Sequence, residues 1–503
     1  MSESGTGQLA GRESFPDPDN ATHVVHDPSF ADLRAFSREM ERTTEYGAPS
    51  YVSEYRSRSA DRTKNTVDHD FDEADRALVA DALAYVADES NDLVCVDRMV
   101  GRHPEESYHA RLYVPKEYGR IALAWAKLLE PAHGDDPDFV TVQIPDYEET
   151  AIRVLVEEGV TVVLGSDYTG EAKKSFLRLF MHRAKRAGGL GLHAGSKRVR
   201  LERDGDLETV GQVFLGLSGT GKSTLTGHGF WLDEPESAVM LQDNVCALRQ
   251  DGVVAGSEGE GLYIKTIGLT REQQPELYDA ATHESAVLEN VAVGEDGDVD
   301  FDGDEHTTNA RAVVKREHLE SAAAHVDLES IDQVFFITRN PLMPPIAKLS
   351  AEQAAAAFML GESIQTSAGD PDAAGESIRV VGTNPFIVGS EGEEGNRFLD
   401  LISDLDVEAF VLNTGTIGGE IDVSVEDTVT LLTQTARGTV EWREEEALGL
   451  AIPKDVPGLD VSRLDVSAVV DDFEEAYADL RAEREAYLSR FDDLRDAVVE
   501  AVY

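Results

Sequence analysis

Apolar residues recur at helical spacing in some segments of the chain and form short continuous runs in others. In Asp72–Glu89, apolar residues at positions 74, 78, 82 and 86 share one face, which predicts an amphipathic helix. We expect further helices at Phe30–Thr43, Tyr118–Leu129, Ala151–Glu158 and Lys173–Ala187. Apolar runs predict strands at Leu93–Val96, Arg111–Val114, Val160–Leu164, Val210–Leu215, Ala238–Leu241, Gln333–Thr338 and Ala409–Leu412.

Four other segments carry weaker patterns. Residues 1–28 are rich in Ser, Gly, Pro and Asp, so we expect a mobile tail there. Gly294–Glu305 is acidic and predicts a hairpin or a loop. Gly361–Glu376 is long for a loop and is interpreted either as a lid or as a surface insertion. Ser467–Val502 predicts a C-terminal helix, packed on its own domain or paired with a partner helix.

The charge balance is strongly acidic. The 503 residues include 97 Asp and Glu against 45 Lys and Arg, a net charge of -52. Self-repulsion of this size is screened at high ionic strength, which indicates adaptation to concentrated salt, although a generally acidic protein is the alternative. Such a surface repels nucleic acid and anionic lipid, so we expect neither as a partner.

The cysteines and the apolar runs indicate the cellular compartment in which the protein is expected. Cys95 and Cys246 lie in predicted strands and give neither a disulfide framework nor a zinc spacing. The sequence contains no apolar run long enough to span a bilayer and no N-terminal signal pattern. We therefore expect a soluble cytoplasmic protein that acts on small molecules.

One motif carries specific chemistry. Residues Gly216-Leu-Ser-Gly-Thr-Gly-Lys-Ser223 match the phosphate-binding loop of P-loop proteins, between a predicted strand and a predicted helix. Glycines allow backbone N–H groups to point at phosphate oxygens, and the helix N-terminus adds a positive dipole. Lys222 can reach the terminal phosphates, and the Ser223 hydroxyl can bind Mg²⁺. The motif predicts nucleoside triphosphate binding.

Further candidates surround this loop in the sequence. Asp243 ends the strand Ala238–Leu241 and could hold a metal ion, or it could cap a turn. Lys173 and Lys174 begin a predicted helix, where their charge opposes the helix dipole, so an anion-binding role competes with a solvated face. His193 follows a glycine-rich turn and could be a metal ligand or a structural histidine.

These patterns predict an α/β fold with two domains, because the chain is long for a single core. We expect an N-terminal α/β domain over residues 29–207. A P-loop-containing mononucleotide-binding domain, which includes the C-terminal helix, is expected over residues 208–503.

Several segments together resemble the ATP-dependent phosphoenolpyruvate carboxykinase family. The resemblance covers roughly residues 93–460. It rests on the loop Gly216–Ser223, on Tyr168–Ser175, and on His193 at the family's spacing from Lys174. Further similar stretches are Gly261–Ile267, Val287–Val291, Thr308–Arg311, Pro344–Leu349 and Asn413–Gly415.

The resemblance implies an N-terminal substrate domain and the decarboxylation of oxaloacetate with phosphoryl transfer from ATP, giving phosphoenolpyruvate in gluconeogenesis. It implies Mn²⁺ held by Lys174, His193 and Asp243, and Mg²⁺ held with ATP by Ser223. Arg102 and Tyr168 would bind the substrate together with Lys174, and Arg311 would bridge substrate and γ-phosphate. The implied nucleotide-binding residues are Gly216, Ser218, Gly219, Thr220, Gly221, Lys222, Ser223, Thr224, Glu276, Arg311 and Thr428, with Lys265 nearby.

The chain also departs from the family pattern. Gln242 stands where the family has the first of two acids, and Asp422 falls where it has a nucleotide-binding arginine. ATP and GTP therefore both stay open, as does a P-loop kinase of related fold that phosphorylates another small acid or a protein serine. A non-catalytic nucleotide-binding regulator is a third reading. The assembly is expected to be a monomer or a small homo-oligomer.

Overall fold

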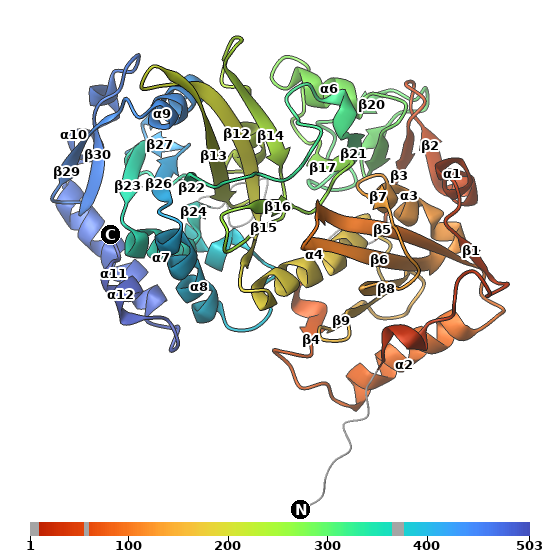
Figure 1. Ribbon diagram of the computed structural model, residues 1–503. Helices are drawn as coiled ribbons and strands as arrows, with labels where there is room; N and C mark the ends of the chain where they lie inside the picture. The colour runs from red at the N-terminus through yellow and green to blue at the C-terminus, as the bar shows by residue number, and fades with distance from the viewer. Residues whose placement is uncertain (1–9, 55–59, 365–376) are drawn as a thin grey trace, which may run out of the picture. The chain divides into compact units, whose positions relative to one another are not determined.

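The computed structural model describes residues 10–54, 60–364 and 377–503, which form two compact units (Figure 1). Unit 1 comprises Met1–Arg183 and Ser257–Glu320, and unit 2 comprises Ala184–Gly256 and Ser321–Tyr503. This division differs from the expected boundary between residues 207 and 208. Strand pairing explains the difference, because residues 261–315 pair with strands near residue 50, and residues 194–203 pair with strands of unit 2.

Unit 1 contains an eight-stranded mixed sheet. Its strand order is β1-β5-β6-β8-β10-β9-β4, with β7 (Glu130–Pro131) on β5. The bounds are β1 Val24–His26, β5 Leu93–His103, β6 Glu106–Pro115, β8 Phe139–Ile144, β10 Val160–Leu164, β9 Ala151–Leu155 and β4 Thr63–Asn65. Helix α2 (Glu73–Ala87) packs Ala82 and Val86 into the core of this sheet, as its apolar stripe predicts.

A second sheet of unit 1 contains strands of Ser257–Glu320, the segment that follows the first part of unit 2 in the sequence. Its order is β17 (Gly261–Lys265), β21 (Arg311–Lys315), β18 (Val287–Glu289), β3 (Pro49–Tyr51) and β2 (Glu41–Thr43). The hairpin β19 (Ala292–Val293) with β20 (Val299–Asp300) falls in the acidic stretch, where a hairpin or loop was expected. The remaining helices are α1 Phe30–Phe36, α3 Gly119–Ala126, α4 Thr169–Arg186 and α6 Pro275–Ala281.

Residues 10–28 differ from the expected tail, whereas residues 1–9 lie outside the described part. Strand β1 pairs in parallel with β5. His26 lies 3.1 Å from the buried carboxylate of Asp97 and 2.7 Å from Asp19. The hydrogen bond that His26 donates to Asp97 outweighs burial and raises the pKa of His26 to about 9. A charged imidazole among carboxylates thus fixes a segment whose composition alone predicts disorder.

Two other local predictions were wrong. Residues 151–155 form strand β9, antiparallel to β10, rather than the start of a helix. The β-branched residues there suit a buried strand, and Gly159, with φ of 71°, allows the tight turn into β10. The helix expected over Phe30–Thr43 ends at Phe36, and residues 41–43 become strand β2.

Unit 2 is built on another eight-stranded sheet. Its order is β14-β12-β13-β22-β26-β23-β30-β29, in which β13, β22 and β26 are parallel neighbours. The bounds are β14 Ser237–Gln242, β12 Ala194–Arg203, β13 Asp206–Gly216, β22 Gln333–Thr338, β26 Glu408–Asn413, β23 Ile346–Leu349, β30 Leu450–Asp455 and β29 Glu441–Glu445. A small sheet joins β11 (Leu190–Leu192), β15 (Cys246–Leu248) and β16 (Val254–Gly256).

Helices contribute to two separate apolar cores of unit 2. Helices α5 (Lys222–Gly227) and α9 (Val425–Arg437) pack with Phe214, Phe335 and Phe410. Helices α7 (Ala351–Leu360), α8 (Glu391–Asp404) and α11 (Phe473–Leu488) enter the other core. The C-terminal segment is three helices, α10 (Val466–Val469), α11 and α12 (Asp496–Glu500), rather than one, and α11 packs on its own unit.

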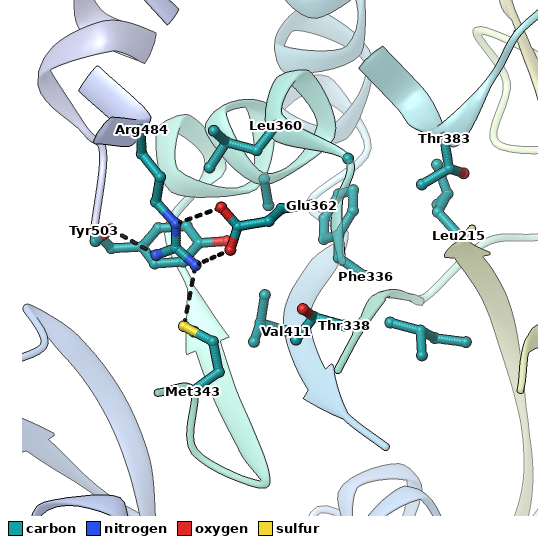
Figure 2. A pocket seen from close by; sticks show the side chains of 13 residues that line it. Leu215, Phe336, Thr338, Met343, Leu360, Glu362, Thr383, Val411, Arg484 and Tyr503 are labelled. Atoms are coloured by element: carbon teal, nitrogen blue, oxygen red, sulfur yellow. Dashed lines mark hydrogen bonds and ion pairs between the residues drawn. The ribbon is translucent and has the colours of Figure 1, made fainter. Parts of the chain in front are cut away.

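A buried ion pair lies in the second of these cores, beside a cavity of about 20 Å³. Figure 2 shows Arg484 of α11 donating to Glu362 of β24 (Glu362–Ile364), to Met343 and to a main-chain oxygen of Tyr503. Strand β24 pairs with β25 (Ser377–Arg379). The lid or insertion expected over Gly361–Glu376 falls mostly on residues 365–376, outside the described part.

Cys95 and Cys246 are both free and buried, in β5 and β15 as expected. Among the described residues, no helix combines the length and the apolarity needed to cross a membrane.

Candidate active site

The phosphate-binding loop of unit 2 connects β13 to α5, as predicted. Gly219 and Gly221 have φ of 84° and 93°, a region that favours glycine. The Thr220 hydroxyl donates to the Leu217 carbonyl at 2.8 Å, and Thr414, just after β26, donates to the Thr220 carbonyl at 2.7 Å. The loop is therefore tied to the carboxyl edge of the parallel strands, where ligands bind in such sheets.

Lys222 and His193 lie together beside this loop. The Lys222 Nζ is 3.3 Å from both the Nε2 and the carbonyl oxygen of His193. His193 Nδ1 lies 2.6 Å from the Thr383 carbonyl, which can only accept, so Nδ1 carries the proton. In the neutral ring Nε2 then presents its lone pair, which can accept from Lys222 or bind a metal ion.

Strand pairing places Asp243 at the same edge of the sheet as His193. His193 precedes the first residue of β12, and Asp243 follows the last residue of the antiparallel neighbour β14, with Ser196 opposite Gln242. The nearby Cys246 thiol is not a good ligand. Burial raises its pKa to about 12, and the charge of Lys222 lowers it only partly, so it stays protonated.

Unit 1 brings together Tyr168, which is predicted to bind the substrate, and Arg311, which is predicted to bridge the substrate and the γ-phosphate. Asn309 links them, because its amide nitrogen donates to the Tyr168 hydroxyl at 3.2 Å and its oxygen accepts from Arg311 at 2.8 Å. Arg311 also lies over the Tyr263 ring at 5.4 Å and stands opposite Lys265 in the β17–β21 pair. Sequence reasoning assigned no role to Asn309, although it lies in the similar stretch Thr308–Arg311.

The two lysines at the start of α4 have different surroundings. Lys173 is buried and forms an ion pair with Glu258 at 2.9 Å, which excludes the solvated face considered for it. Lys174 is 3.0 Å from Glu171 and 5.5 Å from the centre of the Tyr168 ring. Both ammonium groups are therefore balanced by a glutamate, which offsets their conflict with the helix dipole.

Glu289 lies in the similar stretch Val287–Val291, but the sequence did not assign it a role. It accepts from the Tyr263 hydroxyl and, at 2.9 Å, from the Thr169 N–H at the start of α4, while Arg120 lies 3.6 Å away. Burial raises the pKa of Glu289 and also that of Tyr263, so the phenol stays a donor. Glu289 thereby connects the first turn of α4 to the Tyr263 ring beneath Arg311.

Arg102 follows Gly101, whose φ of 84° and closeness to the Glu106 carbonyl leave no room for a side chain. Its guanidinium contacts Glu130 at 2.6 Å and Glu260 at 2.7 Å. The predicted carboxylate-binding arginine thus already holds two carboxylates of the chain.

The remaining predicted residues divide between the units. Ser218 is partly exposed and Ser223 and Thr224 are exposed, all in or beside the loop of unit 2. Thr428 is buried in α9, where its hydroxyl donates to the Ser424 carbonyl. Lys174, Arg102 and Glu276 belong to unit 1, whereas His193 and Asp243 belong to unit 2. The meeting of Lys174 with His193 and Asp243 stays a prediction.

Comparisons with known proteins show the family of the chain. The family model described as phosphoenolpyruvate carboxykinase matches residues 23–462. A protein of Aeropyrum pernix named phosphoenolpyruvate carboxykinase (ATP) is 38% identical over 426 residues, covering 84% of each chain. One of the same name from Chelativorans sp. is 30% identical over 423 residues, covering 79% of this chain and 75% of the relative. The chain belongs to the ATP-dependent phosphoenolpyruvate carboxykinase family.

Proposed function

We propose that this chain converts oxaloacetate and ATP to phosphoenolpyruvate, ADP and CO₂. The observation that carries the proposal is the phosphate-binding loop with Lys222 held against His193, and with Asp243 following the neighbouring strand. A nucleotide-binding protein without decarboxylase activity needs the loop but has no use for a histidine whose lone pair faces the loop lysine. We further propose that the enzyme works in the cytoplasm on small-molecule substrates.

The donor atoms fit the divalent cations that the family implies. His193 is oriented by the Thr383 carbonyl, because a metal-binding histidine commonly donates its other ring N–H to a backbone carbonyl or a carboxylate. Asp243 supplies a carboxylate, and Lys174 would complete the Mn²⁺ set as a neutral amine. Ser223 would hold Mg²⁺ together with ATP. When bound, the cations supply charge that stabilises the enolate and phosphate oxygens.

The side chains of the chain have separate roles in the proposed reaction. Arg102 binds the substrate carboxylate, with Tyr168 at the side of the same site. Loss of CO₂ leaves the electron pair of the broken C–C bond in an enolate. The enolate oxygen attacks the γ-phosphorus in line and breaks its bond to the β-phosphate oxygen, releasing ADP. Lys222 and Arg311 neutralise the charge on the transferred phosphoryl group.

The test is direct. The purified chain is incubated in concentrated KCl with oxaloacetate, Mn²⁺ and either ATP or GTP, and phosphoenolpyruvate is followed over time. We expect product with ATP, and the GTP arm tests whether Asp422 has changed nucleotide choice. A folded sample that forms no product with either nucleotide would reject the proposal.

A further inference from the structure

The guanidinium of Arg102 sits between two glutamates from different segments of unit 1. Its NH2 nitrogen is 2.6 Å from Glu130 Oε1 and 2.7 Å from Glu260 Oε1. The two carboxylates are 38% and 36% exposed, and the arginine is 21% exposed. These are contact ion pairs at a site that water reaches, rather than a buried structural pair.

Local structure keeps both glutamates in place. Glu130 lies in β7, opposite Met99 of β5, the strand that leads into Gly101 and Arg102. The Glu260 N–H donates to the Leu128 carbonyl at 2.9 Å. At the neighbouring Gly259, an added Cβ would lie 2.4 Å from the Arg102 Nε, so the arginine packs closely on this backbone.

Glu260 has a second cationic partner. Its other oxygen, Oε2, lies 3.2 Å from the Lys315 Nζ. If Arg102 turns to another carboxylate, Glu260 keeps an ion pair with Lys315, which lowers the free-energy cost of releasing Arg102. Glu130 has no such second contact among the ion pairs of the described residues.

We propose that Glu260, assisted by Glu130, competes with the substrate carboxylate for Arg102 and so sets the KM for oxaloacetate. The inference rests on the proposed function, in which Arg102 binds that carboxylate. A guanidinium binds a carboxylate best through two parallel N–H bonds, so the substrate must displace at least one resident glutamate. Exposed ion pairs are weak enough for an anion at millimolar concentration to displace them.

The experiment compares Glu260→Gln with the wild type in KM for oxaloacetate, KM for ATP and kcat. The amide keeps the shape but removes the charge, so we expect the KM for oxaloacetate to fall about two- to fivefold, with the other two constants unchanged. Glu89→Gln, an exposed acid on the same unit, is the matched control and should leave all three constants unchanged.

Lys315→Met tests whether Glu260 carries the effect, because it should change the KM for oxaloacetate in the opposite direction to Glu260→Gln. Without Lys315, Arg102 is the cationic partner that Glu260 keeps within the described part of the chain, so the KM for oxaloacetate should rise. The same substitution in the Glu260→Gln background should then have no effect, because the carboxylate that it acts on is gone. An equal rise in both backgrounds would overturn this role of Glu260.

Salt gives an independent readout. Screening affects the contacts of Arg102 with the substrate and with Glu130 alike in both proteins, but only the wild type has a Glu260–Arg102 ion pair for salt to weaken. The KM ratio of wild type to Glu260→Gln should therefore approach one as KCl is raised. If the wild type and Glu260→Gln both turn over and have equal KM values for oxaloacetate at all salt concentrations, the inference is overturned but the proposed function is not. A wild type without turnover rejects the function, and calorimetric binding of oxaloacetate to both proteins then decides the inference.

Discussion

Replacing Arg484 by methionine should destabilise unit 2 strongly, because it leaves a carboxylate buried without its main partner. Arg484 donates to Glu362 through Nε at 3.2 Å and through NH2 at 2.7 Å, and both side chains are at most 4% exposed. After the change, Glu362 keeps Arg379 at 3.0 Å and Asn340 at 2.9 Å. Methionine fills most of the volume, so the lost charge dominates the effect.

The expected magnitude follows from the protonation of Glu362. Burial alone would raise its pKa, but the charge and hydrogen bond of Arg484, with smaller contributions from Arg379 and Asn340, lower it to about 2. A lowering from the ordinary value near 4.5 corresponds to roughly 3 kcal/mol of stability at neutral pH. Removing one partner of a buried ion pair typically costs about 3–5 kcal/mol, which agrees with that figure.

Equilibrium unfolding in urea at fixed KCl measures the loss. The matched control is Arg495→Met, whose pair with Asp400 has similar distances, 2.5 and 2.8 Å, but is nearly half exposed, and it should cost about 1 kcal/mol or less. Adding Glu362→Gln to Arg484→Met removes the stranded charge and should restore much of the stability. If Arg484→Met is no less stable than Arg495→Met, or the double variant is no better than the single, the reasoning fails.

The same pair predicts a pH dependence. Because the folded-state pKa of Glu362 is depressed, its stabilisation is fully present above about pH 4.5 and is lost as the pH falls toward 2. The Arg484→Met variant should lose stability less steeply over that range. Parallel curves of unfolding free energy against pH for the two proteins would contradict the assigned cause.

Three further outcomes are expected. Lys222→Ala should abolish phosphoenolpyruvate formation while the thermal unfolding midpoint stays near that of the wild type, and retained turnover would remove Lys222 from the phosphate site. His193→Ala should raise the Mn²⁺ concentration needed for half-maximal activity, and an unchanged metal dependence would reject it as a ligand. Hydrogen bonding to Asp97 raises the pKa of His26 to about 9, so the charged imidazole stabilises the fold fully below about pH 6.5 and this stabilisation is lost as the pH rises through 9. The thermal unfolding midpoint of the wild type should therefore fall over that pH range, and that of His26→Asn should fall less.

Local sequence signals were sufficient for the phosphate-binding loop and for seven strands that carry apolar runs, namely β5, β6, β10, β13, β14, β22 and β26. The loop needs glycines at Gly219 and Gly221 and a lysine at the start of a helix, and all of these lie within eight residues. Strand β22 occupies the range Gln333–Thr338 as predicted, because a buried parallel strand is a continuous apolar run. Residues 151–155 misled the prediction because a five-residue run carries too few positions to separate strand from helix periodicity.

Contacts between distant segments could not be predicted in this way. Asn309 reaches Tyr168 because β21 pairs with β17 and β18. The sequence between these strands gives no signal of that pairing. The same pairing places Ser257–Glu320 in unit 1, which a division of the chain at a single boundary does not reproduce. The partners of Arg102 likewise depend on the register of β7 on β5, which no residue pattern near Arg102 encodes.

The solvent exposure of an ion pair decides how strongly salt affects the contacts between the many carboxylates of this chain and the cations of the candidate site. An acid-rich chain offers many carboxylates to the same cations that must bind anionic substrates. Lys173 and Glu258 are both under 10% exposed, so salt has little access to their ion pair, and that contact should persist at any KCl concentration. Glu130 and Glu260 are more than one-third exposed, so their hold on Arg102 weakens as salt rises. Of these two cations, Arg102 rather than Lys173 should therefore contribute to a salt dependence of substrate affinity.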